Sequence, residues 1–288
     1  MDLASELARH RDFLLGVAYR LLGSMHAAED VVQDAYLRAE RAGTDEVREP
    51  RAWMTRIVTR LALDELRSAR VRREAYVGPW LPEPLVAPVD EHADPADRVT
   101  LDDQVSLALL TVLQTLSPPE RAVYVLHEAF GVPLHEVARI VGRTPEACRQ
   151  LASRARRHVQ DRAPRFDADP DEQARVVEAF KVAAEQGDFD TLAALLDEAV
   201  VVRADGGGVV TAARKPITGR ERVLRTFAAG RRGAQEFSVR RVLVNGDPGL
   251  LLRADGQVAV LAFVVADGRI THIDIVANPD KLGAAGQL

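Results

Sequence analysis

Apolar residues in the first part of the chain recur every three or four positions, the spacing that places them on one face of an α-helix. One such stripe covers residues 13–22 and stops at Gly23, a residue that readily ends helices. A second stripe covers residues 26–42, and a third begins after Pro50 and continues to residue 74. The pattern predicts three amphipathic helices that bury their apolar faces.

Residues 74–97 interrupt these stripes with a run rich in proline and acidic side chains. Because proline disrupts helices and central strands, we expect a stiff linker here with no regular element. Tyr76 and Trp80 are more apolar than a simple spacer needs. Apolar positions from Leu101 to Leu116 then return to helical spacing, which predicts a helix that packs behind the next motif.

Residues 117–159 combine caps, stripes and turns in the order of a helix-turn-helix. Ser117 and Glu120 have the spacing of a capping box at the start of the first helix. After a short middle helix, Gly142 makes the turn and Thr144 caps the third helix.

That third helix is strongly basic. It carries Arg149, Arg154, Arg156 and Arg157 against the single acid Glu146. A basic helix after a tight glycine turn can enter the major groove, read base edges and contact phosphates. The alternative is an ordinary helical hairpin with a solvated basic face. The agreement of turn, caps and charge favours DNA binding.

The hydrophobic period changes in the last third of the chain. Two helical stripes within residues 169–198 give way to alternation, and one more helix is predicted at residues 219–230. The glycine run at 205–208 is expected to turn a hairpin. Four further strands are delimited by Asn245-Gly246, Asp255-Gly256 and Asp267-Gly268. Helices followed by an antiparallel meander predict an α+β cone.

Charge is segregated along the chain, although the net charge is only −5. Residues 51–73 hold seven Arg against two acids, whereas residues 83–103 hold seven acids against one Arg. Local basic patches matter more for phosphate binding than the total charge. The single cysteine, Cys148, excludes an intramolecular disulfide. With no signal peptide and no apolar run of membrane length, we expect a cytoplasmic protein with no membrane partner.

The stretch PPERAVYVLHEAFGVPLHEVARIVGRTPEACRQLASRARR resembles the promoter-binding domain of a sigma-70-type transcription initiation factor. The N-terminal stretch AEDVVQDAYLR narrows the resemblance to the extracytoplasmic-function (ECF) class. The runs YVGPWLPEP, DGGG and NPDKL resemble the SigJ-like members, which carry a SnoaL-like (NTF2-like) C-terminal domain. The resemblance implies a multidomain protein. Its first all-α sigma domain would cover residues 1–73 and the second residues 98–163, joined by a linker at residues 74–97. An α+β cone would follow at residues 168–288.

The resemblance implies a factor that directs core RNA polymerase to promoters and opens the −10 region, with no cofactor, metal or chemistry of its own. Its partners would be promoter DNA and the clamp helices and flap of the polymerase. The clamp-helix contacts are expected at Asp30, Gln33, Asp34 and Arg38. The −10 contacts are expected at Arg56, Arg60, Arg67 and Arg70, although Asn is common in the family at the position of Arg60. The −35 contacts are expected at Thr144, Arg149, Gln150, Ser153, Arg154, Arg156 and Arg157.

Two features keep alternatives open. Trp53, among the basic residues of the third helix, could stack on a base, but a core position is favoured. By resemblance the acidic linker threads toward the polymerase active centre. A solvated linker with Trp80 tucked against a neighbouring domain explains the same residues.

The C-terminal cone is expected to regulate the factor through two segments that read as exposed docking elements. These are Asp205, Gly206, Gly207 and Gly208, and then Asn278, Pro279, Asp280, Lys281 and Leu282. A cone can also hold a small-molecule ligand, so a ligand-sensing helix-turn-helix regulator is one alternative. His272 and Asp274 would share one face of a strand and, with Asp205, could serve acid–base chemistry of a cyclase or isomerase. Fold alone does not establish an enzyme, and a non-catalytic role is favoured.

Overall fold

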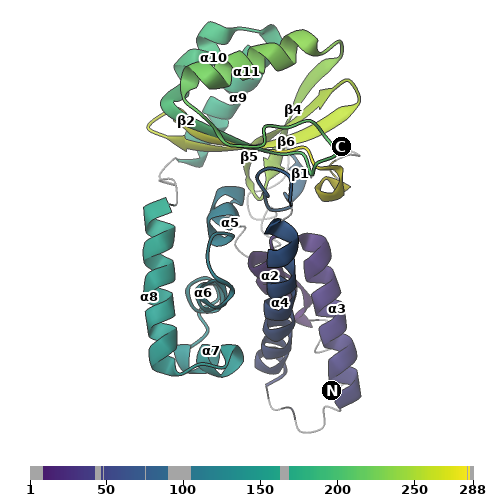
Figure 1. The fold of residues 1–288 in the computed structure, drawn as a ribbon, viewed down its shortest axis with the longest axis vertical. Helices are drawn as coiled ribbons and strands as arrows, with labels where there is room; N and C mark the ends of the chain where they lie inside the picture. Colours follow the sequence, from purple (N-terminus) through teal and green to yellow (C-terminus); the bar gives the residue numbers. More distant parts are fainter. Residues whose placement is uncertain are drawn as a thin grey trace. The chain divides into compact units, whose positions relative to one another are not determined.

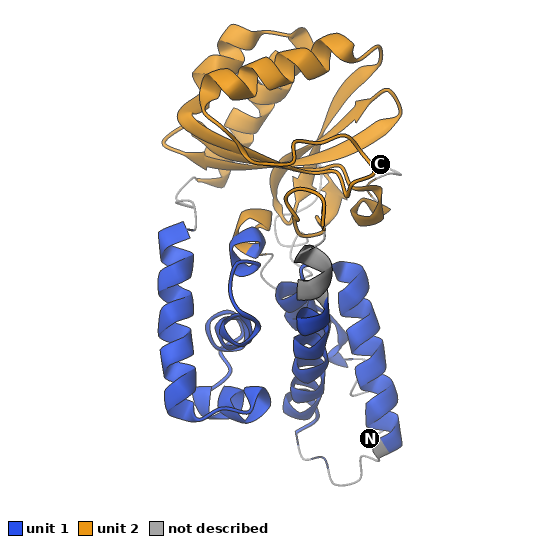
Figure 2. Cartoon of the chain, in the orientation of Figure 1, with its two compact units in different colours: residues 1–74, 99–103, 110–162 blue, residues 75–98, 104–109, 163–288 orange. Residues whose placement is uncertain are grey.

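The computed structural model describes residues 9–42, 47, 49–74, 76–89, 105–162, 169–283 and 285, without the side chains of residues 42 and 69–74. The chain forms two compact units (Figure 2). The first consists of residues 1–74, 99–103 and 110–162. The second consists of residues 75–98, 104–109 and 163–288, so the proline-rich linker belongs with the C-terminal part.

Three amphipathic helices open the first unit: α2 (Arg11–Leu22), α3 (Met25–Ala42) and α4 (Pro50–Glu74) (Figure 1). The predicted boundaries are confirmed, since Gly23 has a φ of 71° and its N–H donates to the Tyr19 carbonyl at 2.7 Å. The apolar stripes of the three helices pack together around fully buried residues such as Leu14, Ala35 and Met54.

Further helical segments follow along the chain: α5 (Leu107–Leu113), α6 (Pro118–Tyr124), a π-helical turn η2 (Val125–Ala129), α7 (Leu134–Val141) and the longer α8 (Pro145–Arg162). The capping box is present, because the Glu120 carboxylate accepts from the Ser117 N–H at 3.2 Å. Gly142 adopts a φ of 67° at the turn. The helix-turn-helix prediction is therefore confirmed. The buried face of its middle helix consists of Val137, Ala138 and Ile140.

The helix before this motif is shorter than predicted. It begins at Leu107, and Val105 is not helical because its carbonyl accepts a hydrogen bond from the Asn245 side chain at 3.2 Å. Residues 101–104 lie outside the described residues. Residues 104–109 count with the second unit and residues 110–113 with the first, so α5 is shared between the units.

The two halves of the first unit pack against each other. Phe13 of α2 meets Phe130, which follows η2, with ring centroids 5.0 Å apart in an edge-to-face arrangement. The Arg20 guanidinium lies over the Phe130 ring at 4.5 Å from its centroid. Arg121 of α6 donates to the Leu21 carbonyl at 2.8 Å, which ties α6 to the end of α2.

A seven-stranded sheet forms the second unit, in the order β1-β4-β5-β6-β7-β2-β3. Its strands are β1 (Val86–Pro88), β2 (Leu196–Asp205), β3 (Ile217–Thr218), β4 (Phe237–Val244), β5 (Asp247–Ala254), β6 (Gln257–Ala266) and β7 (Arg269–Val276). Its helices are α9 (Pro170–Gln186), α10 (Phe189–Leu195) and α11 (Arg220–Gly233), with a 3-10 turn η3 (Pro279–Lys281) near the end. Three of the strand connections are the predicted hairpins, because Asn245, Asp255 and Asp267 and the glycine after each have positive φ.

Two predictions about this sheet are wrong. The glycine run at 205–208 does not turn a hairpin: β2 pairs in parallel with β7, and only the two-residue β3 returns to it. The linker also contains a regular element, since β1 pairs antiparallel with β4. Proline is tolerated in β1 because the strand lies at the sheet edge.

Each face of the sheet is covered by different parts of the chain. Helices α9, α10 and α11 cover one face around a core that includes Phe180, Leu196 and Ile273 (Figure 1). On the other face, a second core joins Leu81 of the linker and Leu282 to sheet residues such as Val260. Among the described residues, no helix is long and apolar enough to cross a membrane.

Candidate functional site

Helix α8 turns one continuous polar face to solvent. Its buried side consists of Cys148, Ala152, Ala155 and Val159, at helical spacing, which confirms Cys148 as a small core residue. Thr144 caps the helix by accepting the Ala147 N–H at 3.2 Å. The other residues expected to contact the −35 element are all exposed: Arg149, Gln150, Ser153, Arg154, Arg156 and Arg157.

Two of the arginines expected to contact the −35 element have partners within the unit. The Arg149 Nη2 lies 3.4 Å from Glu146 Oε1, but both side chains are more than 60% exposed and such a pair contributes little. Arg156 Nη2 lies 2.6 Å from Glu128 Oε1 on η2, and this hydrogen bond raises the pKa of the Arg156 guanidinium. Arg156 therefore connects α8 to η2 and also faces solvent.

Helix α3 has a clean division between its faces. Ala28, Val32, Ala35 and Ala39 are buried. The residues predicted to contact polymerase, Asp30, Gln33, Asp34 and Arg38, are all exposed. We call these four residues the α3 row. Among the described residues, the only ion-pair partner of the α3 row is the exposed His26, 3.7 Å from Asp30. The row is therefore open to a partner.

The basic side of α4 is partly covered by the helix-turn-helix. Arg60 Nη2 donates to the Arg139 carbonyl of α7 at 3.5 Å, while Arg67 pairs with Asp64 at 2.9 Å in solvent. The prediction that Trp53 lies in the core is wrong, because its side chain is only half-buried. Together with Arg56, Arg139 and other residues, Trp53 lines a cleft of ≈ 550 Å³ between α4 and α7. The side chain of Arg70 lies outside the described residues.

A buried carboxylate in the second unit holds the linker. Asp205, at the end of β2, has no exposed surface. Its Oδ1 accepts from the Tyr76 hydroxyl at 2.5 Å and from the Gly207 N–H at 3.0 Å. Its Oδ2 accepts from the Leu81 N–H at 2.9 Å. One side chain thus fixes linker residues that are 124 or more positions away in sequence.

Lys281 completes this arrangement. Its Nζ lies 2.7 Å from Asp205 Oδ2 and 2.6 Å from the Leu81 carbonyl, and its side chain is only 10% exposed. The ammonium also lies over the Trp80 ring at 4.0 Å from the centroid, a favourable cation–π geometry. Burial, together with the Asp205 hydrogen bond, raises the pKa of the Tyr76 phenol, which keeps it a donor. We call Tyr76, Trp80, Leu81, Asp205 and Lys281 the linker clasp.

Asn245 forms a second attachment. Its backbone N–H donates to the Leu85 carbonyl at 2.7 Å, and its side-chain Oδ1 accepts from the Leu85 N–H at 3.1 Å. Its Nδ2 donates to the Val105 carbonyl at 3.2 Å. Asn245 is 2% exposed, so one buried side chain ties together the two ends of residues 86–104.

Comparisons with known proteins place these features in a family. Residues 7–72 match the family model for sigma-70 region 2, and residues 106–159 match that for sigma-70 region 4. The chain is 40% identical to the ECF RNA polymerase sigma factor SigJ of Mycobacterium tuberculosis, over 96% of this chain and 92% of that protein. It belongs to the ECF RNA polymerase sigma factors. As a sigma factor, it acts with core RNA polymerase on promoter DNA.

Two further comparisons extend the likeness to the C-terminal unit of this sigma factor. A probable ECF sigma factor SigI of M. tuberculosis is 38% identical, over 95% of this chain and 92% of that protein. The crystal structure of M. tuberculosis SigJ superposes with a TM-score of 0.76 and 34% identity, over 97% of this chain and 98% of that chain. The C-terminal unit of this sigma factor has the predicted SnoaL-like, NTF2-like α+β fold.

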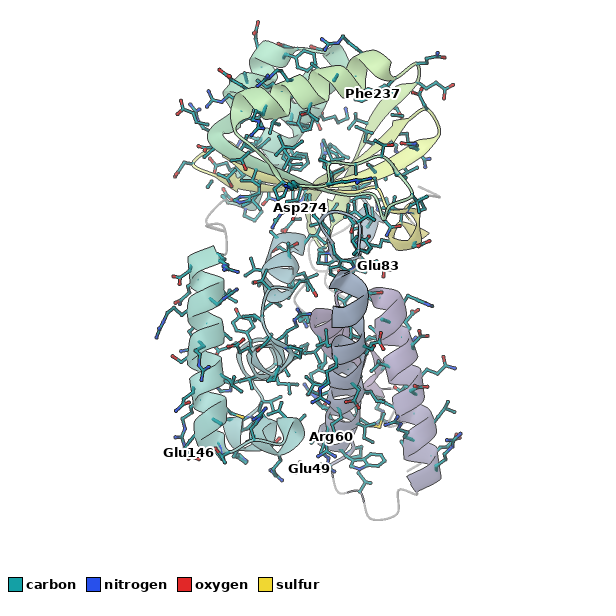
Figure 3. The ribbon with its side chains drawn as sticks, in the orientation of Figure 1. Glu49, Arg60, Glu83, Glu146, Phe237 and Asp274 are labelled. Carbon is teal, nitrogen blue, oxygen red and sulfur yellow. The ribbon has the colours of Figure 1, made fainter. Side chains whose placement is uncertain are left out.

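Two of the residues considered for acid–base chemistry, Asp274 and Asp205, have other partners within this sigma factor. Asp274 and His272 lie on the sheet face opposite the helices, because Ile273 and Ile275 between and beside them face the helix-covered core (Figure 3). Asp274 makes a bidentate pair with Arg203, at 2.6 and 2.9 Å. Burial lowers the pKa of His272, and Asp205 is committed to the clasp. The described residues contain no cluster of His, Cys, Asp and Glu suited to a metal ion.

The sequence interpretation of this sigma factor missed how the C-terminal segments are used. The segments at 205–208 and 278–282 are not simply exposed: Asp205, Asn278 and Leu282 are buried, because they contact the linker and the sheet. Lys281 was detectable from its rarity, since only three of the 38 basic residues are Lys. A compact ammonium fits a small buried site that the wider guanidinium would not.

Proposed function

We propose that this sigma factor contacts polymerase and promoter through the polar faces of three helices. The α3 row binds the clamp helices of polymerase, the basic side of α4 opens the −10 element, and α8 reads the −35 element while its domain meets the flap. The support is the family match together with the exposure of the α3 and α8 sets and of Arg60 and Arg67 on α4. Such a factor works where polymerase and promoter DNA are, in the cytoplasm.

The α3 assignment is tested by charge reversal. Replacing Asp30 and Asp34 with Lys should weaken capture of core polymerase and leave the circular dichroism spectrum unchanged, because both side chains are exposed. Glu40→Lys, also exposed on α3, is the matched control and should bind normally. Capture at the unmodified level by the double variant would remove α3 from the polymerase interface.

We further propose that the C-terminal unit regulates the factor by holding the connection between its two promoter-binding parts. The observation that carries this is the double attachment of that connection: the linker clasp holds residues 76–81, and Asn245 holds Leu85 and Val105. Between these points the chain has only residues 86–104. Even fully extended, they span at most about 65 Å, and the Asn245 contacts bring their ends together.

Promoter geometry sets a demand on this connection. The −35 and −10 elements are centred about 25 base pairs apart, which is roughly 85 Å of B-form DNA. Release of Leu85 and Val105 would free the linker to lengthen, and release of the clasp would free it further. The C-terminal unit would thereby set how readily both parts engage one promoter.

The decisive experiment is run-off transcription with core polymerase and the intact chain carrying Asn245→Gly. Glycine tolerates the φ of 53° at this turn, so the hairpin should survive while the side-chain bonds to Leu85 and Val105 are lost. Asp267→Gly, at the same place in another hairpin with a φ of 51°, is the control. Promoter output should change for Asn245→Gly alone, at equal protein concentration. Equal output and promoter choice in all three proteins would contradict regulation through the connection.

No catalytic role is proposed for the C-terminal unit. The relatives that cover the whole chain are named as sigma factors. The support from the structure is the pairing of Asp274 with Arg203 on the sheet face away from the helices.

A further inference from the structure

A cavity lies inside the second unit, between its helices and the sheet. Its volume is ≈ 240 Å³. Phe180 of α9, Phe189 of α10 and Phe227 of α11 line one side, and Leu252, Leu261 and Ile275 line the sheet side. It lies on the opposite sheet face from Asp205 and the linker clasp, so it is separate from the site described above.

The cavity has one charged group. Its other walls are almost entirely aliphatic or aromatic, and Arg231 near the end of α11 is the only ionisable residue among the described ones that line it. Within the described residues, the Nε of Arg231 is buried and has no hydrogen-bond partner. Its guanidinium lies over the Phe237 ring, 4.6 Å from the centroid.

An unsatisfied cationic donor beside an apolar cavity favours an anionic ligand. A buried donor without a partner costs free energy, which a carboxylate could recover through a charge-assisted hydrogen bond. The planar fork of Arg matches a carboxylate, while the phenylalanine and leucine walls match a hydrocarbon body.

The volume limits the size of that body. An apolar cavity of about 150 Å³ accommodates benzene, and pockets for drug-sized ligands start at about 300 Å³. We propose that this cavity binds a small apolar carboxylic acid, either a monocyclic aromatic acid or a medium-chain fatty acid, with its carboxylate on Arg231. The part of the chain that the structure describes puts no Asp, Glu, His or Cys on the cavity wall, so the site suits binding and not acid–base turnover of the ligand.

Binding is tested with octanoate and 3-phenylpropionate as probes, and with octanamide as the neutral analogue of the first. The intact protein is used in isothermal titration calorimetry and in thermal unfolding. Both acids should bind saturably and raise the unfolding temperature, and octanamide should bind roughly tenfold more weakly or worse. Equal affinity for octanoate and octanamide would exclude a role for the charge, and the absence of saturable binding by either acid would overturn the site.

Substitutions locate the site. Arg231→Gln should weaken octanoate at least about tenfold and leave octanamide unaffected, whereas Arg232→Gln, at the exposed next position, should bind like the unmodified protein. Gly230→Leu tests the cavity itself. Gly230 lines the cavity and is exposed, and a Cβ there meets no atom within 4 Å, so leucine should fit without strain and obstruct the open side of the cavity. This variant should fold normally and lose both acids; retained binding by Gly230→Leu would place the ligand elsewhere.

Discussion

The two units of this sigma factor differ in how the charged side chains of their candidate sites are used. In the first unit, the arginines of α8 and the acids of α3 stand in water, and a pair such as Arg149–Glu146 is 62% and 67% exposed. In the second unit, the Lys281–Asp205 pair is 10% and 0% exposed and bonded on all sides. Exposed charges keep their binding capacity for a partner. Buried charges are already paired within the chain, where they hold one segment against another.

The largest expected effect comes from removing the buried charge. Asp205→Ala leaves Lys281 without its carboxylate and takes an acceptor from Tyr76 and Leu81. Breaking a buried pair in this way costs about 3–5 kcal/mol of unfolding free energy. Urea unfolding followed by Trp80 fluorescence, in a Trp53→Phe background, measures it.

Asp280→Ala is the control for that measurement, because Asp280 is exposed in the same segment. Its free energy of unfolding should change by no more than about 0.5 kcal/mol. If the two variants unfolded alike, the clasp would contribute nothing to the stability of the second unit.

A second carboxylate, that of the half-buried Asp247 at the start of β5, sharpens the comparison because its environment opposes ionisation. Burial raises the pKa of this carboxyl from 3.8 to about 6. Between about pH 4 and pH 6 the unfolded chain therefore loses a proton that the folded chain keeps, so stability falls as pH rises through this window. Above pH 6 the full penalty applies, on the order of 2–3 kcal/mol.

Asp247→Asn should remove that penalty. The variant is expected to be more stable than the unmodified chain at pH 7 and equal to it near pH 3, as measured by urea unfolding at each pH. Asp267→Asn, an exposed turn residue, provides the control. A stability difference that is the same at both pH values would exclude Asp247 as the titrating group.

Among the exposed charges of the first unit, we expect different arginines of α8 to contact base edges and phosphates. Arg149→Ala should relax the −35 sequence preference by about 1–3 kcal/mol, because residues early in the recognition helix meet base edges. Arg157→Ala should weaken all promoters alike and lower the salt dependence by about one ion, as loss of a phosphate contact does. Holoenzyme binding to matched and −35-mutated promoters at several salt concentrations separates these outcomes. Uniform loss in both variants would contradict the division.

The sequence predicted features that depend on near neighbours. The Ser117–Glu120 box, the Thr144 cap and the Asn-Gly and Asp-Gly hairpins each involve residues within a few positions, so their signals are local. The polar rows of α3 and α8 were likewise predicted from the helical spacing of residues that are close in sequence.

Features that depend on distant pairing could not be predicted. The parallel match of β2 with β7 and the match of β1 with β4 join segments with no shared local signal. The glycine run after Asp205 resembles a hairpin turn, yet its glycines serve close approach: a Cβ on Gly206 would lie 2.2 Å from the Val210 carbonyl oxygen. The linker was predicted to be irregular from its prolines, and only the folded sheet provides the edge that β1 joins.

The smallest expected effect compares one glycine from each unit. Gly142, in the helix-turn-helix, and Gly207, beside the clasp, have almost the same left-handed φ, 67° and 65°. Alanine at either position costs about 1–2 kcal/mol of backbone strain. A Cβ at Gly142 meets nothing within 4 Å, whereas a Cβ at Gly207 would lie 2.4 Å from the Asn278 side chain.

Asn278 cannot move aside freely, because it is 4% exposed, donates to the Tyr76 hydroxyl at 3.0 Å and accepts the Asp280 N–H at 3.1 Å. Gly207→Ala should therefore cost about 1 kcal/mol more than Gly142→Ala, within the range for overpacking. Urea unfolding followed by Trp53 for the first unit and by Trp80 for the second, each with the other tryptophan replaced by Phe, gives both values. Equal costs would mean that Asn278 yields without loss, and that the clasp is looser than its hydrogen bonds indicate.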